Sequence, residues 1–206
     1  MSNLIHGVNI IRAYELSWLN LKGKPQLAAL EIAQNYQVSV QKPFNTRDLK
    51  KFLESLNNQY YEDLDAVKTL IAEYLACDIK IISQAEFSDS KNMIFFEKLH
   101  NSCNFGLRFV CDETEQPYLG TLNLILDDKN NKTLLVNLKK ELLNLRDLKF
   151  SPEDFADKVF SGLMELVQNN IVMSLHLNRR GGISQQFIRS LTDLDFNKFI
   201  VRSILE

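Results

Sequence analysis

The feature that most constrains the fold is an order of five expected elements that occurs twice along the chain. Alternating, aromatic-rich segments predict a hairpin, helical spacing of apolar residues predicts two helices after it, and a short apolar run predicts a closing strand. These elements are expected at residues 12–20, 26–33, 45–56, 63–75 and 79–83, and again at residues 105–111, 119–126, 134–144, 152–167 and 171–178. A repeat of this length indicates two copies of one supersecondary unit.

Such a unit predicts an α+β fold in which an antiparallel sheet is backed by two helices. We expect an N-terminal module over residues 1–85, a linker over residues 86–104, and a C-terminal module over residues 105–206. Two units side by side leave open sheet edges, which favour association unless they are paired. We therefore expect a homodimer or higher homo-oligomer that closes a barrel, with a monomer whose edges are covered as the alternative.

Composition narrows the classes of function. The chain has 206 residues, with 24 Lys and Arg against 26 Asp and Glu, so its formal charge of -2 gives no overall attraction to nucleic acid or anionic membranes. No apolar run approaches the roughly 20 residues that span a bilayer. Three cysteines without a CxxC spacing support neither a zinc site nor a disulfide framework. We expect a cytoplasmic protein without a metal, a membrane or a direct nucleic-acid partner.

Cys111 is the cysteine most suited to chemistry, because it is expected where a strand ends and a polar turn begins. Reactive thiols occupy accessible positions of this kind, whereas structural thiols are buried and inert. From composition and position alone, a cysteine without a chemical role is favoured over a nucleophile. Glu153 is expected in the first turn of a helix, where a carboxylate is favourable even without a function.

Basic residues mark two further candidate positions. Arg179, Arg180, Gly181 and Gly182 follow what is expected to be the last strand, where guanidinium groups and free backbone N–H groups can meet a phosphate. The alternative is a basic turn without a ligand. Arg47 and Lys50 give the first helix a basic side, which in most proteins is simply solvated.

Three stretches together resemble one known family. Residues 14–20 (YELSWLN) with residues 22–25 (KGKP), the spacing Cys111-x-x-Thr-x-Gln-Pro-x-x-Gly120, and the Arg-Arg-Gly-Gly string followed by Arg189-Ser190 are similar to segments of the NADPH-dependent 7-cyano-7-deazaguanine reductases of the bimodular type. The resemblance covers most of the chain. It implies the tunnelling fold, a deazapurine substrate, NADPH as cofactor and a place in queuosine biosynthesis, a tRNA modification.

The resemblance also implies a mechanism. In the family a cysteine thiol adds to the nitrile carbon to give a covalent thioimide, which two hydrides from two NADPH molecules reduce to the aminomethyl product. On this basis Cys111 is the expected nucleophile and Glu153 the expected anchor of the purine edge. The expected residues for cofactor phosphate are Arg179, Arg180, Gly181, Gly182, Arg47 and Lys50.

The sequence departs from the family pattern at three positions. Tyr118 stands where the family has its catalytic aspartate, Pro152 where it has a histidine, and Asn45 where the first module has a glutamate. Tyr118 is the residue expected at the acid position, although a phenol has an ordinary pKa near 10; nearby candidates to replace the acid are Asp112, Glu113 and Glu115. Two functions stay open, namely an active nitrile reductase and a non-catalytic relative that binds a purine-like ligand or partners an active subunit.

Overall fold

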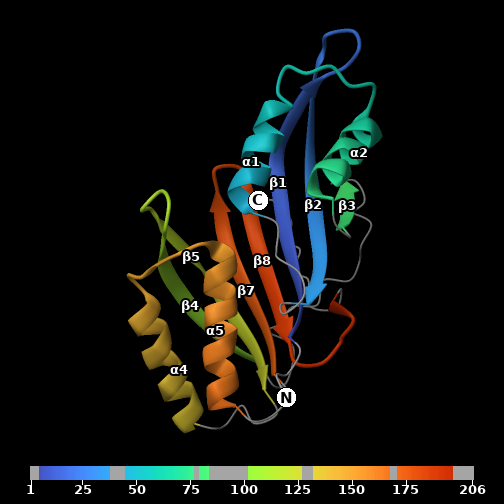
Figure 1. The fold of residues 1–206 in the computed structure, drawn as a ribbon. Coiled ribbons are helices and arrows are strands. Elements are labelled where there is room, and N and C mark those ends of the chain that lie inside the picture. Colours follow the sequence, from blue (N-terminus) through green and yellow to red (C-terminus); the bar gives the residue numbers. More distant parts are fainter. Residues whose placement is uncertain are drawn as a thin grey trace.

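The computed structural model describes residues 5–37, 45–76, 79–83, 102–126, 132–167 and 171–196. It has an α+β architecture in which four helices back one eight-stranded sheet (Figure 1). The strands are β1 (His6–Leu19), β2 (Pro25–Gln37), β3 (Ile79–Ser83), β4 (Ser102–Cys111), β5 (Pro117–Leu126), β6 (Lys149–Phe150), β7 (Ile171–Arg180) and β8 (Ile183–Ser190). The helices are α1 (Thr46–Ser55), α2 (Leu64–Leu75), α4 (Lys132–Leu145) and α5 (Pro152–Leu166).

The sheet is continuous across both halves of the chain, in the order β3-β2-β1-β8-β7-β5-β4-β6. Neighbouring strands are antiparallel except for β6, which pairs with β4 in parallel over two positions. The first and last strands of the sequence, β1 and β8, lie side by side at the centre. The two halves are therefore joined by the pairing of these two strands.

Local signals explain where the helices begin. Asn45 caps α1, because its side chain accepts hydrogen bonds from the backbone N–H groups of Arg47 and Asp48 at 2.9 and 3.2 Å. Asp63 caps α2 in the same way, and Pro152 occupies the first turn of α5, where the missing N–H costs nothing. The predictions of these helices are confirmed to within a few residues.

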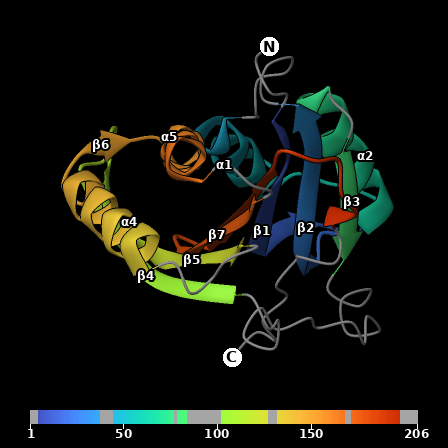
Figure 2. The same ribbon diagram turned by 90° about the horizontal axis from the view of Figure 1, so that it is seen from below.

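The helices cover one face of the sheet and divide the core into two clusters (Figure 2). Helices α4 and α5 bury one cluster, in which Phe109, Phe155 and Phe160 are fully enclosed. Helices α1 and α2 bury the other against β1 and β2, with Leu49, Val67 and Ile71 fully enclosed. The N-terminal ends of α1 and α5 lie where the two clusters meet, at the middle of the sheet.

The expectation that the second half ends with a strand over residues 171–178 is wrong. Strand β7 continues through Arg180, Gly181 and Gly182 form a turn with positive φ angles, and β8 follows as a fully buried central strand. Strand β8 was not predicted because several of its residues are polar. The linker expected over residues 86–104 also ends too late, because β4 begins at Ser102; residues 86–101 lie outside the described part of the chain.

The sheet is open rather than closed in the structure. Among the described residues its outer strands are β3 and the very short β6. Because β6 pairs only with Val110 and Cys111, the rest of β4 has no strand on its outer side within the part of the chain that is described. In the same part, no helix is long and apolar enough to cross a bilayer.

Candidate functional site

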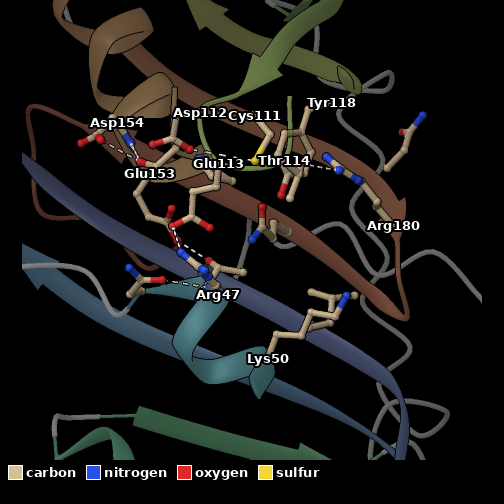
Figure 3. A pocket seen from close by; sticks show the side chains of 17 residues that line it. Arg47, Lys50, Cys111, Asp112, Glu113, Thr114, Tyr118, Glu153, Asp154 and Arg180 are labelled. Atoms are coloured by element: carbon tan, nitrogen blue, oxygen red, sulfur yellow. Dashed lines mark hydrogen bonds and ion pairs between the residues drawn. The ribbon is translucent and has the colours of Figure 1, made fainter. Parts of the chain in front are cut away.

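A cavity of about 510 Å³ lies between the two halves of the fold. The first turns of α1 and α5 line it from the helix side, and the turn after β4, the start of β5 and the ends of β7 and β8 line the remainder. Cys111, Tyr118, Glu153, Arg47, Lys50 and Arg180 are all among its lining residues (Figure 3). The structure therefore brings together six of the nine residues singled out from the sequence as site residues.

The turn after β4 fixes the position of Cys111. Its backbone N–H donates to the carbonyl of Gln116 at 2.9 Å, and its carbonyl accepts from Glu115, whose φ of 57° closes the turn. Strand β6 holds the other side, since the N–H of Asp112 donates to the carbonyl of Phe150 at 3.2 Å. Cys111 is only 6% exposed, so the thiol is buried at the cavity wall rather than accessible as expected.

Asp112 is the carboxylate nearest to the thiol. The Cys111 Sγ lies 3.9 Å from Asp112 Oδ1, within reach of an S–H to oxygen hydrogen bond (Figure 3). The other two candidate acids have cationic partners. Glu113 pairs with Arg47 at 2.7 Å, and Glu115 pairs with Lys149 and is not among the residues that line the cavity.

Glu153 is the most buried acid of the cavity, at 7% exposed. The Thr46 hydroxyl at the start of α1 donates a hydrogen bond to Glu153 Oε1, which links the two halves at the site. Burial raises the pKa of Glu153, and the hydrogen bond from Thr46 opposes that shift. A carboxylate held in this way is suited to grip N–H groups of a ligand, because two oxygens can meet two donors.

Tyr118 forms part of the cavity wall in an aromatic stack. Its ring stacks on Phe109 with centroids 5.0 Å apart, and the Arg180 guanidinium carbon lies 4.7 Å from the Tyr118 ring centroid. Burial raises the pKa of Tyr118 to about 12, with a further contribution from Cys111. A phenol with this pKa keeps its proton at neutral pH and is a weak proton donor.

The side chains of Arg179 and Arg180 point in different directions from β7. Arg180 reaches the cavity, and its Nη2 donates to the Thr114 hydroxyl at 2.7 Å and to Gln116. Arg179 points elsewhere: it forms an ion pair with Glu15, lies 4.8 Å over the Tyr14 ring, and does not line the cavity. Successive side chains of a strand point to opposite faces, which accounts for this divergence.

The glycine pair lies beside the cavity without lining it. A Cβ at Gly181 would come within 2.5 Å of the Lys50 Nζ, so the ammonium group of α1 sits directly against the turn. Glycine is needed here for the positive φ angles of 56° and 78° at Gly181 and Gly182. The turn that follows β7 is thus in contact with a cation from α1, and Lys50 and Arg180 both line the cavity.

Thr46 and Gln185 are among the polar cavity residues that were not predicted as site residues. The contact of Thr46 with Glu153 spans 107 positions of sequence. Gln185 lines the cavity from β8, a strand that was not predicted. The one available signal was the position of Thr46 in the first turn of a helix that also carries basic residues.

The cavity and its walls define a class of site. A buried thiol with a neighbouring carboxylate, a second buried carboxylate and flanking cations form a small-molecule site with a candidate nucleophile, set between two helix pairs on one sheet. Comparison with known proteins finds sequences that are similar to this chain.

Residues 2–85 match the family profile described as "Nitrile reductase, 7-cyano-7-deazaguanine-reductase N-term". Over 237 residues of alignment the chain is 25% identical to the NADPH-dependent 7-cyano-7-deazaguanine reductase of Legionella pneumophila strain Corby, covering 98% of this chain and 82% of the relative. The proteins of the same name from strains Paris and Lens are similar to the same extent. The chain is thus similar to the 7-cyano-7-deazaguanine reductases, which is the resemblance that its motifs predicted.

Proposed function

We propose that this protein reduces the nitrile of 7-cyano-7-deazaguanine to the aminomethyl product through a thioimide on Cys111, with NADPH as the reductant. The product would enter queuosine biosynthesis, as the family resemblance implies. The observation that carries the proposal is the presence of the Cys111 thiol and the Glu153 carboxylate on the walls of one cavity, both buried. The names of the Legionella relatives support the substrate and the cofactor.

In the first step the Cys111 sulfur forms a bond to the nitrile carbon, and one C–N π bond is broken. The thiol proton passes to Asp112, whose Oδ1 lies 3.9 Å from Sγ, and Asp112 returns it to the nitrile nitrogen to give the neutral thioimide. No proton is gained or lost overall. Asp112 thus takes the task of the aspartate that the family carries at the position of Tyr118.

Glu153 holds the substrate while this step occurs. Its two carboxylate oxygens match the two N–H donors on the guanidine-like edge of a deazaguanine, and burial strengthens such a charge-assisted contact. The hydrogen bond from Thr46 orients one oxygen before the ligand arrives. The ring is then fixed with its nitrile toward the Cys111 side of the cavity, which lowers the entropic cost of the addition.

The cationic end of the cavity fits a cofactor phosphate. The Nη1 of Arg180 is buried without a hydrogen-bond partner among the described residues, and Lys50 lies against the Gly181–Gly182 turn. These residues would hold the phosphate groups of NADPH, together with Arg47 once its pairing with Glu113 is released. Two bound NADPH molecules in succession supply two hydrides, and two protons complete the conversion of the nitrile to the amine.

The deciding experiment is intact-mass spectrometry after the protein is mixed with 7-cyano-7-deazaguanine. We expect one added equivalent of the nitrile, its loss in Cys111→Ala, and its retention in the matched control Cys103→Ala. NADPH oxidation should follow the same pattern. Ligand-induced thermal stabilisation without an adduct or NADPH oxidation would instead establish the non-catalytic relative, and absence of all three would reject both functions.

The proposal extends to the assembly. We propose that residues 1–85 and 105–206 are two modules of one tunnelling-fold design, because each half contains a pair of strands, two helices and a later strand in that order. The second half adds the two-residue β6 between its helices and β8 after β7. A second copy pairing along the outer side of β4 would extend the sheet towards a closed barrel. Light scattering after gel filtration tests the assembly: a mass of one chain, 23.8 kDa, would contradict it.

A further inference from the structure

One side chain of the cavity is not explained by the chemistry above. Gln185 lies on β8 between Ile183 and Phe187, which belong to the two different core clusters. Its partners across the sheet are Ile11 on β1 and Leu177 on β7, both apolar. An amide side chain therefore lies at the apolar seam, by which we mean the boundary between the two core clusters, where an aliphatic residue would pack.

The amide is buried without being satisfied. Gln185 is 3% exposed, and its Oε1 has no hydrogen-bond partner among the residues that the structure describes. Buried polar groups are normally paired, because an unpaired acceptor has lost its contacts with water and gained nothing in return. The same side chain lines the cavity that holds Cys111 and Glu153. A bound molecule in that cavity is the partner that the oxygen lacks.

A second buried polar group of this cavity is also unpaired among the described residues, and the phosphate of NADPH is the partner proposed for it above. The Nη1 of Arg180, on the neighbouring strand β7, is also buried without a partner in the described part of the chain, and it lines the same cavity. Its guanidinium is held by Thr114, Gln116 and the Tyr118 ring. One free acceptor and one free donor are thus presented from adjacent strands, in positions set before any ligand binds.

We propose that Gln185 is a specificity-determining residue whose Oε1 accepts a hydrogen bond from an N–H of a bound heterocycle that Glu153 does not contact. The ligand class is a flat heterocycle with N–H donors on more than one edge, as a deazapurine free base has. The identity of the ligand rests on the proposed function. The role of Gln185 rests on its burial and its unpaired oxygen.

The binding test uses the full chain with Cys111→Ala, so that no covalent step contributes, and 7-cyano-7-deazaguanine as the probe. Calorimetry should show that Gln185→Leu weakens binding by about tenfold, as expected when one buried hydrogen bond is lost. The matched control is Gln26→Leu on β2, whose amide contacts only the turn carbonyls of Lys24 and Pro25. It should leave the dissociation constant unchanged. Equal affinity in the Gln185→Leu protein would overturn the inference while the proposed function stands.

A second measurement does not depend on the ligand. If the amide serves a ligand, Gln185→Leu replaces an unpaired polar group by an apolar one at an apolar seam. The midpoint of thermal unfolding of the free protein should then stay the same or rise. A marked fall would show that Gln185 stabilises the fold and would overturn the inference, even if the Cys111→Ala protein binds no deazapurine and the proposed function has failed.

Discussion

Thr46 and Glu153 form a hydrogen bond between the first turns of two helices that belong to opposite halves of the chain. The hydroxyl donates, the carboxylate accepts, and both side chains line the cavity. Because this contact stabilises the ionised carboxylate, it lowers the pKa of Glu153 against the larger effect of burial, which raises it. The pKa of Glu153, in the second half of the chain, therefore depends on a hydroxyl from the first half.

This relationship predicts the effect of Thr46→Val. Loss of the hydrogen bond should raise the pKa of Glu153 further, so a larger fraction of the acid is protonated at mildly acidic pH. Only the ionised form of Glu153 can accept hydrogen bonds from two N–H donors. As the solution is acidified, the affinity of Thr46→Val for the deazapurine should therefore begin to fall at a higher pH than the affinity of the protein with Thr46. Calorimetric titrations across the acidic to neutral range, in the Cys111→Ala background, measure this shift. Thr46→Ser keeps the hydroxyl and should retain the original profile.

Asp112→Asn should slow formation of the Cys111 adduct. The amide cannot take the thiol proton, and removal of such proton transfer costs about 10²-fold in rate. Rapid-quench intact-mass measurements give the rate, and Glu115→Gln, whose carboxylate pairs with Lys149 outside the cavity, is the matched control. A rate in Asp112→Asn equal to that of the control would exclude Asp112 as the acid.

Tyr118→Phe tests the residue that occupies the family's acid position. The pKa of Tyr118 is raised to about 12, and the stack of its ring on Phe109 does not require the hydroxyl. We therefore expect the rates of adduct formation and NADPH oxidation in Tyr118→Phe to stay within about threefold of those of the unmodified protein. A loss of about 10²-fold or more would assign the proton transfer to the phenol instead.

Gly120→Ala should weaken the sheet. A Cβ at Gly120 would lie 2.2 Å from the backbone carbonyl oxygen of His176 on β7, closer than any atom can approach without movement of a strand. We expect a loss of more than about 2 kcal/mol in the free energy of unfolding, measured by urea denaturation. Gly106→Ala on β4, where the added methyl meets nothing within 4 Å, is the matched control. Equal stability of the two variants would contradict the close approach of β5 and β7.

His176 should make stability depend on pH. Burial, with a smaller contribution from Arg12, lowers the pKa of His176 from 6.5 to about 4, so the folded state binds fewer protons than the unfolded state between these values. The neutral imidazole therefore contributes stability that is fully present above pH 6.5 and is lost as the pH falls towards about 4, a change on the order of 1–3 kcal/mol. His176→Gln should flatten this part of the profile in urea titrations, and an unchanged profile in this variant would contradict the prediction.

The sequence allowed good prediction of the elements that carry local signals. Helices α1 and α5 were predicted from the helical spacing of their apolar residues, a signal that acts over only a few positions, as do the Asn45 cap and Pro152 at their first turns. The hairpins were found for the same reason. Cys111, Glu153 and Arg180 were predicted as site residues, and they line one cavity.

Strand β8 could not be predicted because its polar residues are satisfied only by distant ones. Gln186, fully buried, accepts from Arg12 of β1 at 3.1 Å and donates to Ser174 of β7 at 2.8 Å. In the sequence these groups interrupt the apolar alternation from which the other strands were predicted. Alternation along β7 from Leu175 and Leu177 would place Arg179 on the cavity side, and the register shift between Leu177 and Arg180 places Arg180 there instead.

The pairing of β1 with β8 also constrains the order in which parts of the chain can fold. Strand β1 has no neighbour on this side until synthesis has reached residues 183–190, and contacts that span so much sequence form slowly. Gln185, Arg180 and the Gly181–Gly182 turn all belong to this late segment. The pocket therefore cannot form during synthesis before β8 has been made, and removal of residues 183–190 would leave β1 paired only with β2 among the described strands and would take Ile183 and Gln185 from the cavity wall.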